Sequence, residues 1–237
     1  MFEQYKPRPF RHWLRHPRTS QERKMWDACG VKGRLRRSPI NLPTSYDDIF
    51  VHYDKCWKSL RKTKWKRIKN MGKYTFFYRG PFSQWYRSAP FEIDGISYNT
   101  AEQWMMAQKA RLFNDEEALE KILATSDPAC QKILGRNVKD FKKEVWEEIE
   151  INGKPRCWNY VYQGNWAKFV QNPDLLDLLF STAGTKLVET SHTDEIWGVG
   201  LDEHDPRIFD ESKWLGTNWL GEVLTKLRED LMAEKAS

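Results

Sequence analysis

Hydrophobic and polar positions after residue 70 recur mainly with a helical period, and only a few short runs alternate as strands do. Strand-like runs lie at 75–78 and 186–191, and a hairpin is expected at 91–98, turning at Asp94-Gly95. Helices are expected at 100–112, 115–124, 128–135, 139–151 and 173–180, with a terminal helix from 221 to about 233. After a break at 152–155, helical structure is expected to resume and to continue to 169. The pattern therefore predicts a helix-dominated α+β fold, a single globular domain with a few short strands.

The helix expected at 100–112 has the most informative pattern. Thr100 can act as its N-cap, and Gln103 three residues later completes a capping-box sequence. Glu102 and Lys109 are seven positions apart, so they fall within about 20° of each other on one face. An acid and an amine within a stripe of Trp and Met residues indicate a lined pocket. The alternative is an ordinary amphipathic helix with two charges at the edge of its buried face, and spacing alone favours that alternative.

A polar and aromatic turn, Phe-Ser-Gln-Trp at 82–85, lies between the expected strands, where ligand contacts are common. Phe82, Ser83, Gln84 and Trp85 are therefore candidate substrate contacts. The alternative is that Phe82 and Trp85 only close the end of the core, and for Phe82 we favour that alternative.

A second candidate loop follows the strand expected at 186–191. Asp194 and Trp197 precede Gly198 and Gly200, and two glycines flanking one residue permit close approach of the backbone to a ligand. A lone Gly-x-Gly is weak evidence for a nucleotide site, so this loop carries an argument only together with other residues.

The composition is that of a folded domain, with 237 residues, 40% hydrophobic and 14% aromatic. No apolar run approaches the roughly 20 residues that cross a bilayer, and the first residues lack the apolar core of a signal peptide. We therefore expect a soluble, cytoplasmic protein with no membrane partner. The four cysteines form no Cys-x-x-Cys pair and the histidines do not complement them, so we expect reduced thiols, no metal and no cofactor.

The net charge of +6 is the sum of two segments with opposite charge balances. Residues 1–70 carry a balance of +13, and residues 71–237 carry −7. Basic clusters interleaved with aromatic residues lie at 8–15, 32–37 and 57–67, and a helix is expected at 46–65. Such interleaving suits a DNA- or RNA-contacting extension at 1–70 joined to a domain at 71–237. A solvated face, or a targeting or partner-binding tail, is the alternative.

Several motifs occur together in a fixed order, and as a set they resemble the NADAR family, also called YbiA-like, over about residues 74–232. The motifs are Phe82-Ser-Gln-Trp85, Ala101-Glu-Gln-Trp-Met-Met-Ala-Gln-Lys-Ala110, Gly135-Arg136, Asn165-Trp-Ala-Lys-Phe169, Leu187-Val-Glu189, Asp194-Glu-Ile-Trp-Gly-Val-Gly-Leu201 and Trp214-Leu-Gly-Thr-Asn-Trp-Leu-Gly221.

The resemblance implies hydrolysis of an N-glycosidic bond at a ribose carbon. By position it makes Glu102 and Lys109 the catalytic pair, with the lysine amine attacking the anomeric carbon to give an imine-type intermediate. The resemblance also implies a pocket lined by Asp194, Trp197 and Gly198, to which we add Gly200. The further candidate contacts are Trp146 and Asn218. Burial would favour the neutral amine of Lys109, whereas the nearby Glu102 would favour its charged form. The spacing of the two residues does not decide which effect is larger.

Two activities accompany the resemblance: removal of ADP-ribose from guanine bases, and cleavage of phosphoribosylated intermediates of riboflavin synthesis. Riboflavin-type members begin the key helix with Ser-Glu-His and replace 201–216 by a compact turn, whereas this chain has Ala-Glu-Gln at 101–103 and the longer segment. Together with the basic extension, this favours an ADP-ribosylhydrolase acting on nucleic acid. The alternatives are a glycosidase of a ribosyl-phosphate metabolite and a non-enzymatic protein that senses ADP-ribose or NAD or is associated with nucleic acid.

Overall fold

The computed structural model describes residues 69–150 and 152–236, which lie in one compact unit spanning Arg67–Ser237. The described part is rich in helices and has a few short strands, which confirms the expected α+β class. The basic clusters at 8–15, 32–37 and 57–67 and the helix expected at 46–65 lie outside the described residues.

A three-stranded sheet brings together two distant parts of the chain. Strand β1 (Lys69–Met71) is antiparallel to β2 (Tyr74–Phe77), and β2 is parallel to β5 (Lys186–Glu189), with Tyr74 opposite Lys186 and Phe77 opposite Glu189. Parallel neighbours require a long crossover, and the main group of helices supplies it.

A separate hairpin is formed by β3 (Phe91–Ile93) and β4 (Ile96–Tyr98). Its two turn residues, Asp94 and Gly95, have φ values of 54° and 77°, as the expected Asp-Gly turn requires.

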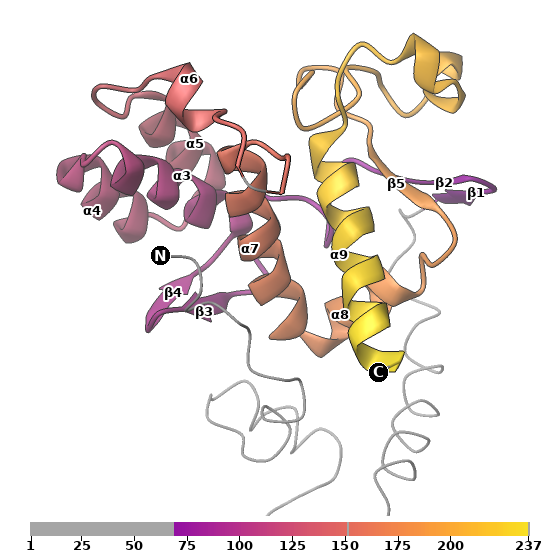
Figure 1. Ribbon diagram of the computed structural model, residues 1–237, viewed down its shortest axis with the longest axis horizontal. Helices are drawn as coiled ribbons and strands as arrows, with labels where there is room; N and C mark the ends of the chain where they lie inside the picture. The colour runs from indigo at the N-terminus through magenta and orange to yellow at the C-terminus, as the bar shows by residue number, and fades with distance from the viewer. Residues whose placement is uncertain (1–68, 151, 237) are drawn as a thin grey trace, which may run out of the picture. The chain divides into compact units, whose positions relative to one another are not determined.

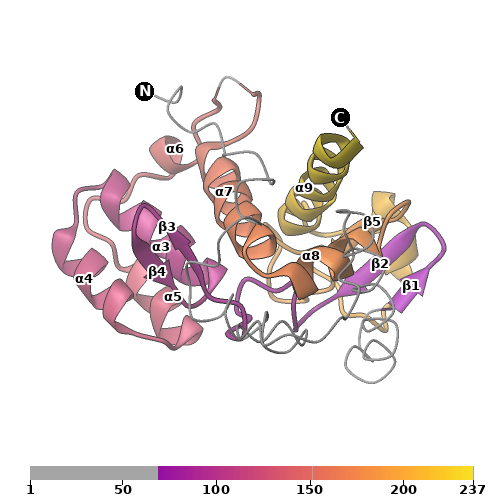
Figure 2. The ribbon, with the colours of Figure 1, turned by 90° about the horizontal axis from the view of Figure 1, so that it is seen from below.

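The helices form successive layers beside the sheet. In Figure 1, α7 and α9 run side by side, with α3, α4 and α5 on one side of the pair and the sheet on the other, and Figure 2 shows the same order from below. Their bounds are α3 Ala101–Leu112, α4 Glu116–Ala124, α5 Pro128–Arg136, α6 Lys143–Trp146, α7 Arg156–Val170, α8 Pro173–Phe180 and α9 Trp219–Ala236. Two short 3₁₀ turns, η2 Pro206–Phe209 and η3 Glu211–Lys213, lie within the long segment before α9.

Both faces of the sheet are buried, so successive strand residues enter different cores. Phe77 and Leu187 belong to the main core shared with the helices. Phe76 and Val188 belong to a smaller core that Ile208, from the 201–216 segment, helps to close. This segment is therefore an ordered cover on one face of the sheet.

The helix expected at 139–151 is reduced to the single turn α6. Asp140 has a φ of 53°, a left-handed conformation that breaks a helix at its start. Ile149 then pairs with Pro155 in an isolated β-bridge around the turn at Gly153, so the chain leaves the helix before 151.

Two helix ends also differ in detail from the sequence-based expectation. Thr100 caps α3 as expected, its side-chain oxygen accepting a hydrogen bond from the Gln103 N–H at 3.0 Å. The Gln103 side chain instead accepts from the Asn99 N–H at 2.8 Å, one residue before the cap. Helix α5 continues one residue past the expected stop at Gly135 and includes Arg136.

Among the described residues, no helix combines the length and the apolar character needed to span a membrane.

Candidate active site

Glu102 lies in the first turn of α3, where the preceding 82–85 turn contacts it directly. The Glu102 N–H donates to the carbonyl oxygen of Gln84 at 3.1 Å. The side chain is only 3% exposed, and its Oε1 has no hydrogen-bond partner among the described residues. A buried carboxylate oxygen without a partner is costly to stability, so this position points to a role other than packing.

The electrostatic surroundings of Glu102 raise the pKa of its carboxyl to about 7. Burial is the largest cause, because it penalises the charged form. Lys132 and a hydrogen bond from the Trp85 side chain lower the pKa, while Asp194 raises it. Burial outweighs the cations, and the carboxyl titrates near neutral pH.

Lys109 lies two turns further along the same face of α3 and is 9% exposed. Its Nζ is 3.7 Å from the ring centre of Phe141 and 5.8 Å from that of Trp146. Burial and then the nearby Arg136 lower its pKa, and Glu102 opposes them. The net direction is downward, so the surroundings favour the neutral, nucleophilic amine more than water does.

The Asp194 carboxylate is held by its own loop. Its Oδ1 accepts hydrogen bonds from the backbone N–H groups of Ile196 at 3.1 Å and Trp197 at 2.8 Å. Its Oδ2 lies 3.7 Å from the Lys132 Nζ. Both oxygens are therefore engaged, which holds the Asp194 side chain in place beside Lys132 and near Glu102.

Glu189 lies at the end of β5, beside this loop. Burial and then Asp194 raise the pKa of its carboxyl to about 8, and Glu102 adds to the effect while Lys132 opposes it. Three carboxyl groups therefore converge from α3, β5 and the 192–200 loop, and the two with raised pKa values can hold protons at neutral pH.

The glycines of the 192–200 loop permit close packing of protein backbone. A Cβ at Gly198 would lie 2.9 Å from the carbonyl oxygen of Asp194 and 3.0 Å from that of Glu189. Gly200 has a φ of 69°, and a Cβ there would lie 2.9 Å from the Leu215 Cβ. These contacts draw the loop against the end of β5, so the expected close approach is made by the chain itself.

Asn218 fixes the same loop from the far side. Its Oδ1 accepts from the Glu189 N–H and its Nδ2 donates to the Leu187 carbonyl, each at 3.0 Å. Its backbone N–H donates to the Gly198 carbonyl at 3.0 Å. Asn218 thus joins β5, through its side chain, to the loop, through its backbone. Trp197 packs edge-to-face on Trp219, with ring centres 5.8 Å apart.

The four residues of the 82–85 turn occupy very different surroundings. Phe82 is fully buried and stacks on Phe169, with ring centres 6.1 Å apart, which is the core placement favoured above. The Ser83 hydroxyl accepts from the Trp85 N–H at 3.2 Å. Gln84 is buried, and its Nε2 has no partner among the described residues. Trp85 is 43% exposed and faces Glu102.

Helix α7 anchors this turn with two polar side chains. The Asn165 Nδ2 donates to the Gln84 Oε1 at 2.7 Å, and the Lys168 Nζ donates to the Ser83 carbonyl at 2.9 Å. Lys168 is fully buried, and burial lowers its pKa to about 7. The turn that contacts Glu102 is therefore fixed from inside the fold.

A family model for the NADAR domain matches residues 64–232. The chain belongs to the NADAR family. It is 38% identical over 170 residues to N-glycosidase R617 of Acanthamoeba polyphaga mimivirus, an alignment that covers 67% of this chain and 96% of that protein. It is 41% identical over 138 residues to protein irg-1 of Caenorhabditis elegans, covering 57% of this chain and 62%, less than two thirds, of that protein.

The NMR structure of Escherichia coli YbiA shares the fold. It superimposes with a TM-score of 0.56 at 30% identity, covering 73% of this chain and 93% of that one. In sequence, N-glycosidase YbiA of Escherichia coli is 32% identical over 156 residues, covering 66% of this chain and 84% of that protein. The names of these NADAR relatives support a glycosidase enzyme.

Four residues that contribute to the NADAR site were not selected from the sequence: Lys132, Arg136, Lys168 and Glu189. Glu189 and Lys168 occur within motifs quoted above, and a charged residue at the end of a buried strand or in an apolar helix is the signal that could have identified them. Arg136 also lies in one of those motifs, Gly135-Arg136, without a role assigned to it, whereas Lys132 looks like an ordinary surface cation until the contact of α5 with α3 is known.

Among the residues that the structure describes, no group of three or more His, Cys, Asp or Glu side chains is arranged to hold a metal ion. Cys130 is an exposed free thiol and Cys157 a buried one.

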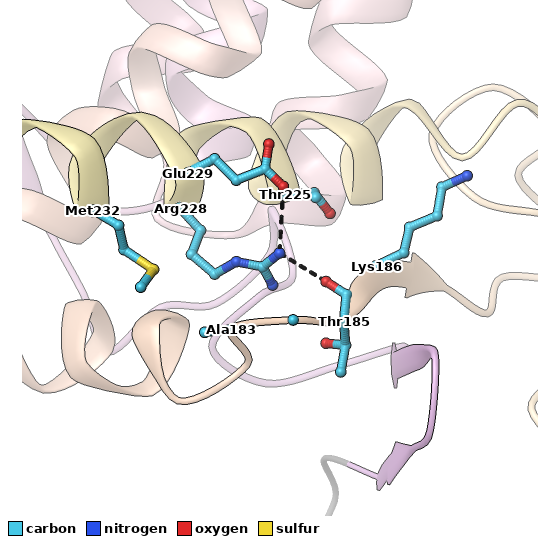
Figure 3. A pocket seen from close by; sticks show the side chains of 8 residues that line it. Ala183, Thr185, Lys186, Thr225, Arg228, Glu229 and Met232 are labelled. Carbon is cyan, nitrogen blue, oxygen red and sulfur yellow. Dashed lines mark hydrogen bonds and ion pairs between the residues drawn. The ribbon is translucent and has the colours of Figure 1, made fainter.

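A surface pocket of about 350 Å³ lies between the turn after α8 and helix α9 and contains none of these site residues. Figure 3 shows the Arg228 guanidinium directed towards this turn. It donates to the carbonyl oxygens of Thr182 and Thr185, each at 2.7 Å, and to the Thr182 hydroxyl at 2.9 Å. Arg228 thus joins α9 to the turn that follows α8.

Proposed function

We propose that this NADAR protein is an N-glycosidase that hydrolyses the bond between a ribose anomeric carbon and a base, removing ADP-ribose from guanine in nucleic acid. The observation that carries the proposal is the pairing on one face of α3. A buried carboxyl group with a pKa near 7, whose Oε1 has no partner among the described residues, shares that face with a lysine whose pKa is lowered. Each group is held away from its ordinary state in water, as catalytic groups often are.

The chemistry assigned to the pair follows from charge. Breaking the base–ribose bond develops positive charge at the anomeric carbon, which the Glu102 carboxylate stabilises. The Lys109 amine forms a bond to that carbon as the bond to the base nitrogen breaks. Ring opening gives an imine, and water then hydrolyses it, releasing the sugar and restoring the amine.

The departing base requires a proton, and Glu189 is suited to provide it. The raised pKa of about 8 keeps its carboxyl largely protonated at pH 7. Asp194 has a positioning role in this proposal, because two backbone N–H groups and Lys132 engage its oxygens.

Groups without partners in the structure indicate how the substrate is held. The Gln84 Nε2 is a buried donor and the Glu102 Oε1 a buried acceptor, and ribose hydroxyl groups would satisfy both. Trp85, 43% exposed, and Phe141, 37% exposed, offer aromatic faces on which a base can stack.

The choice of guanine-linked ADP-ribose is supported by the parts of the chain that a small metabolite does not need. The 201–216 segment covers the sheet beside the 192–200 loop, and residues 1–70 carry a balance of +13. A phosphoribosylated riboflavin intermediate is the second candidate. It is supported by a relative named riboflavin biosynthesis protein VVA0006 of Vibrio vulnificus, 30% identical over 139 residues that cover 59% of this chain and 32% of that protein.

A release assay with two substrates tests the proposal. The full-length protein is incubated with an oligonucleotide carrying ADP-ribose on guanine and, separately, with a phosphoribosylated pyrimidine intermediate. We expect free ADP-ribose from the first and little release of ribose 5-phosphate from the second. The reverse preference would establish the second candidate, and binding of ADP-ribose without turnover of either would establish a sensor.

Deletion of residues 1–63, which keeps the whole NADAR match, isolates the role of the basic extension. We expect this variant to have a higher KM for the oligonucleotide at low salt and an unchanged kcat. An unchanged KM would show that the extension does not hold the polymer.

A further inference from the structure

The last turn of α5 is packed directly onto the catalytic face of α3. A Cβ built at Gly135 would lie 1.9 Å from the Met106 Sδ and 2.7 Å from its Cγ. Met106 lies between Glu102 and Lys109 on that face. The absence of a side chain at Gly135 therefore lets the end of α5 reach the middle of the proposed site.

Arg136 is the next residue along the chain. It is exposed, and its guanidinium makes no hydrogen bond or ion pair with any residue in the described part of the chain. It nevertheless lies close enough to lower the pKa of both Glu102 and Lys109. A guanidinium that is near two proposed catalytic groups, and unpaired among the described residues, can bind an anion.

Lys132 lies four residues earlier, so it shares a face of α5 with Arg136. Its Nζ is 3.7 Å from the Asp194 Oδ2 and 5.8 Å from the ring centre of Trp85. It also lowers the pKa of Glu102 and of Glu189. Two cations therefore lie on the α5 side of the site, across from the carboxyl groups that the other elements contribute.

We propose that Arg136 and Lys132 form a phosphate-binding pair that holds the phosphate on the ribose C5 while the anomeric carbon meets Glu102 and Lys109. This inference rests on the proposed function. Both candidate substrates carry that phosphate, and any carboxylate charge in the site would repel it without cations nearby. Arginine suits the task because its planar fork donates two parallel hydrogen bonds to phosphate oxygens.

The spacing of Arg136 and Lys132 leads us to expect that the two candidate ligands contact the pair differently. Side chains four apart on a helix have Cβ atoms about 5–6 Å apart, which suits neighbouring phosphates of a diphosphate. Arg136 binds the phosphate attached to ribose, which ADP-ribose and ribose 5-phosphate share. Lys132 binds the second phosphate, which only ADP-ribose has.

Isothermal titration calorimetry on the full chain tests this arrangement with ADP-ribose, ribose 5-phosphate and adenosine as probes. Loss of a charge-assisted hydrogen bond predicts that Arg136→Gln binds ADP-ribose and ribose 5-phosphate about 10- to 100-fold more weakly, with adenosine unchanged. Arg136→Lys should recover part of the affinity. Lys132→Gln should weaken ADP-ribose more than ribose 5-phosphate. The matched control is Lys121→Gln on α4, which removes one exposed charge paired with Glu117 and should change neither affinity.

Two further measurements distinguish loss of phosphate binding from misfolding of a variant and from failure of the proposed reaction. In the wild type, rising salt should weaken ADP-ribose binding and leave adenosine binding unchanged. In the release assay, Arg136→Gln should raise KM more than it lowers kcat, since the phosphate is remote from the bond that breaks.

Equal ADP-ribose affinity in wild type and Arg136→Gln, or salt-independent binding, would overturn the phosphate site even if release is normal. A Lys132→Gln variant that loses equal affinity for both phosphates would overturn its assignment to the second phosphate. Failure of the wild type to cleave either substrate, with phosphate-dependent binding intact, would overturn the proposed function and leave the binding pair standing.

Discussion

Replacing Glu102 by glutamine should make the protein more stable at alkaline pH and less active. The carboxyl is 3% exposed, and its Oε1 has no partner among the described residues. Glutamine keeps the shape of the side chain and cannot ionise. The substitution therefore removes the cost of a buried charge while leaving the packing of α3 in place.

The size of the effect follows from the raised pKa. The carboxyl titrates at about 7 in the folded state and at 4.5 in the reference state. Between these values the unfolded chain binds fewer protons, so the wild type loses stability as pH rises from 4.5 to 7. The shift corresponds to about 3 kcal/mol at 1.36 kcal/mol per pKa unit. This penalty is absent below pH 4.5 and complete above pH 7.

Urea unfolding of wild type and Glu102→Gln at pH 5 and pH 8 measures this quantity. The difference in unfolding free energy between variant and wild type should move in favour of the variant by about 2–3 kcal/mol between the two pH values. Any fixed cost of burying the amide cancels in the comparison. The control Glu120→Gln removes an exposed carboxylate from α4 and should show no such movement.

A difference that stays constant between pH 5 and pH 8 would contradict a raised pKa, because it would mean that Glu102 ionises as readily in the folded protein as in water. The same variant should lose at least about 100-fold in kcat/KM, the scale associated with one preorganised electrostatic group.

Three further predictions concern single residues. Sodium borohydride added during turnover should reduce the imine at Lys109 and leave a sugar adduct there, which peptide mass spectrometry can locate. The Lys109→Met variant should form no adduct, and an adduct at another lysine would contradict the assignment. Lys168 has a pKa of about 7 when folded and 10.5 in the reference state, so the unfolded chain binds more protons and stability rises with pH across that window. Lys168→Met should remove a slope of up to about 1.4 kcal/mol per pH unit in urea unfolding between pH 7.5 and 9.5, and an unchanged slope would contradict its burial. Gly164→Ala should cost about 1–3 kcal/mol of unfolding free energy, because its Cβ would lie 2.3 Å from the rigid indole of Trp104, and a neutral result would show that α3 and α7 can separate freely.

Local signals in the sequence account for the elements that were predicted well. The Asp94-Gly95 turn fixes its hairpin because both residues accept positive φ values. Thr100, Asp115 and Asp127 each begin a helix because their side chains accept a backbone hydrogen bond. The helix expected at 139–151 failed because Asp140 takes a left-handed conformation, which a periodicity argument does not detect.

The relative positions of candidate site residues were predictable only for residues that lie in the same helix. Glu102 and Lys109 share a helix face, so their relation follows from spacing. The places of Arg136 and Glu189 depend on contacts between distant elements, such as Gly135 on Met106 and β5 beside the 192–200 loop. Loop glycines gave an ambiguous signal, because close approach to a ligand and close approach to the chain require the same residue.

The most direct test of the proposed activity is a single-turnover release assay with full-length wild type and Glu102→Gln on an oligonucleotide bearing ADP-ribose on guanine. We expect the wild type to yield intact ADP-ribose and unmodified oligonucleotide, and the folded variant to yield neither on the same time scale. Release at equal rates by both proteins, or no release by the wild type at any concentration, would contradict this expectation.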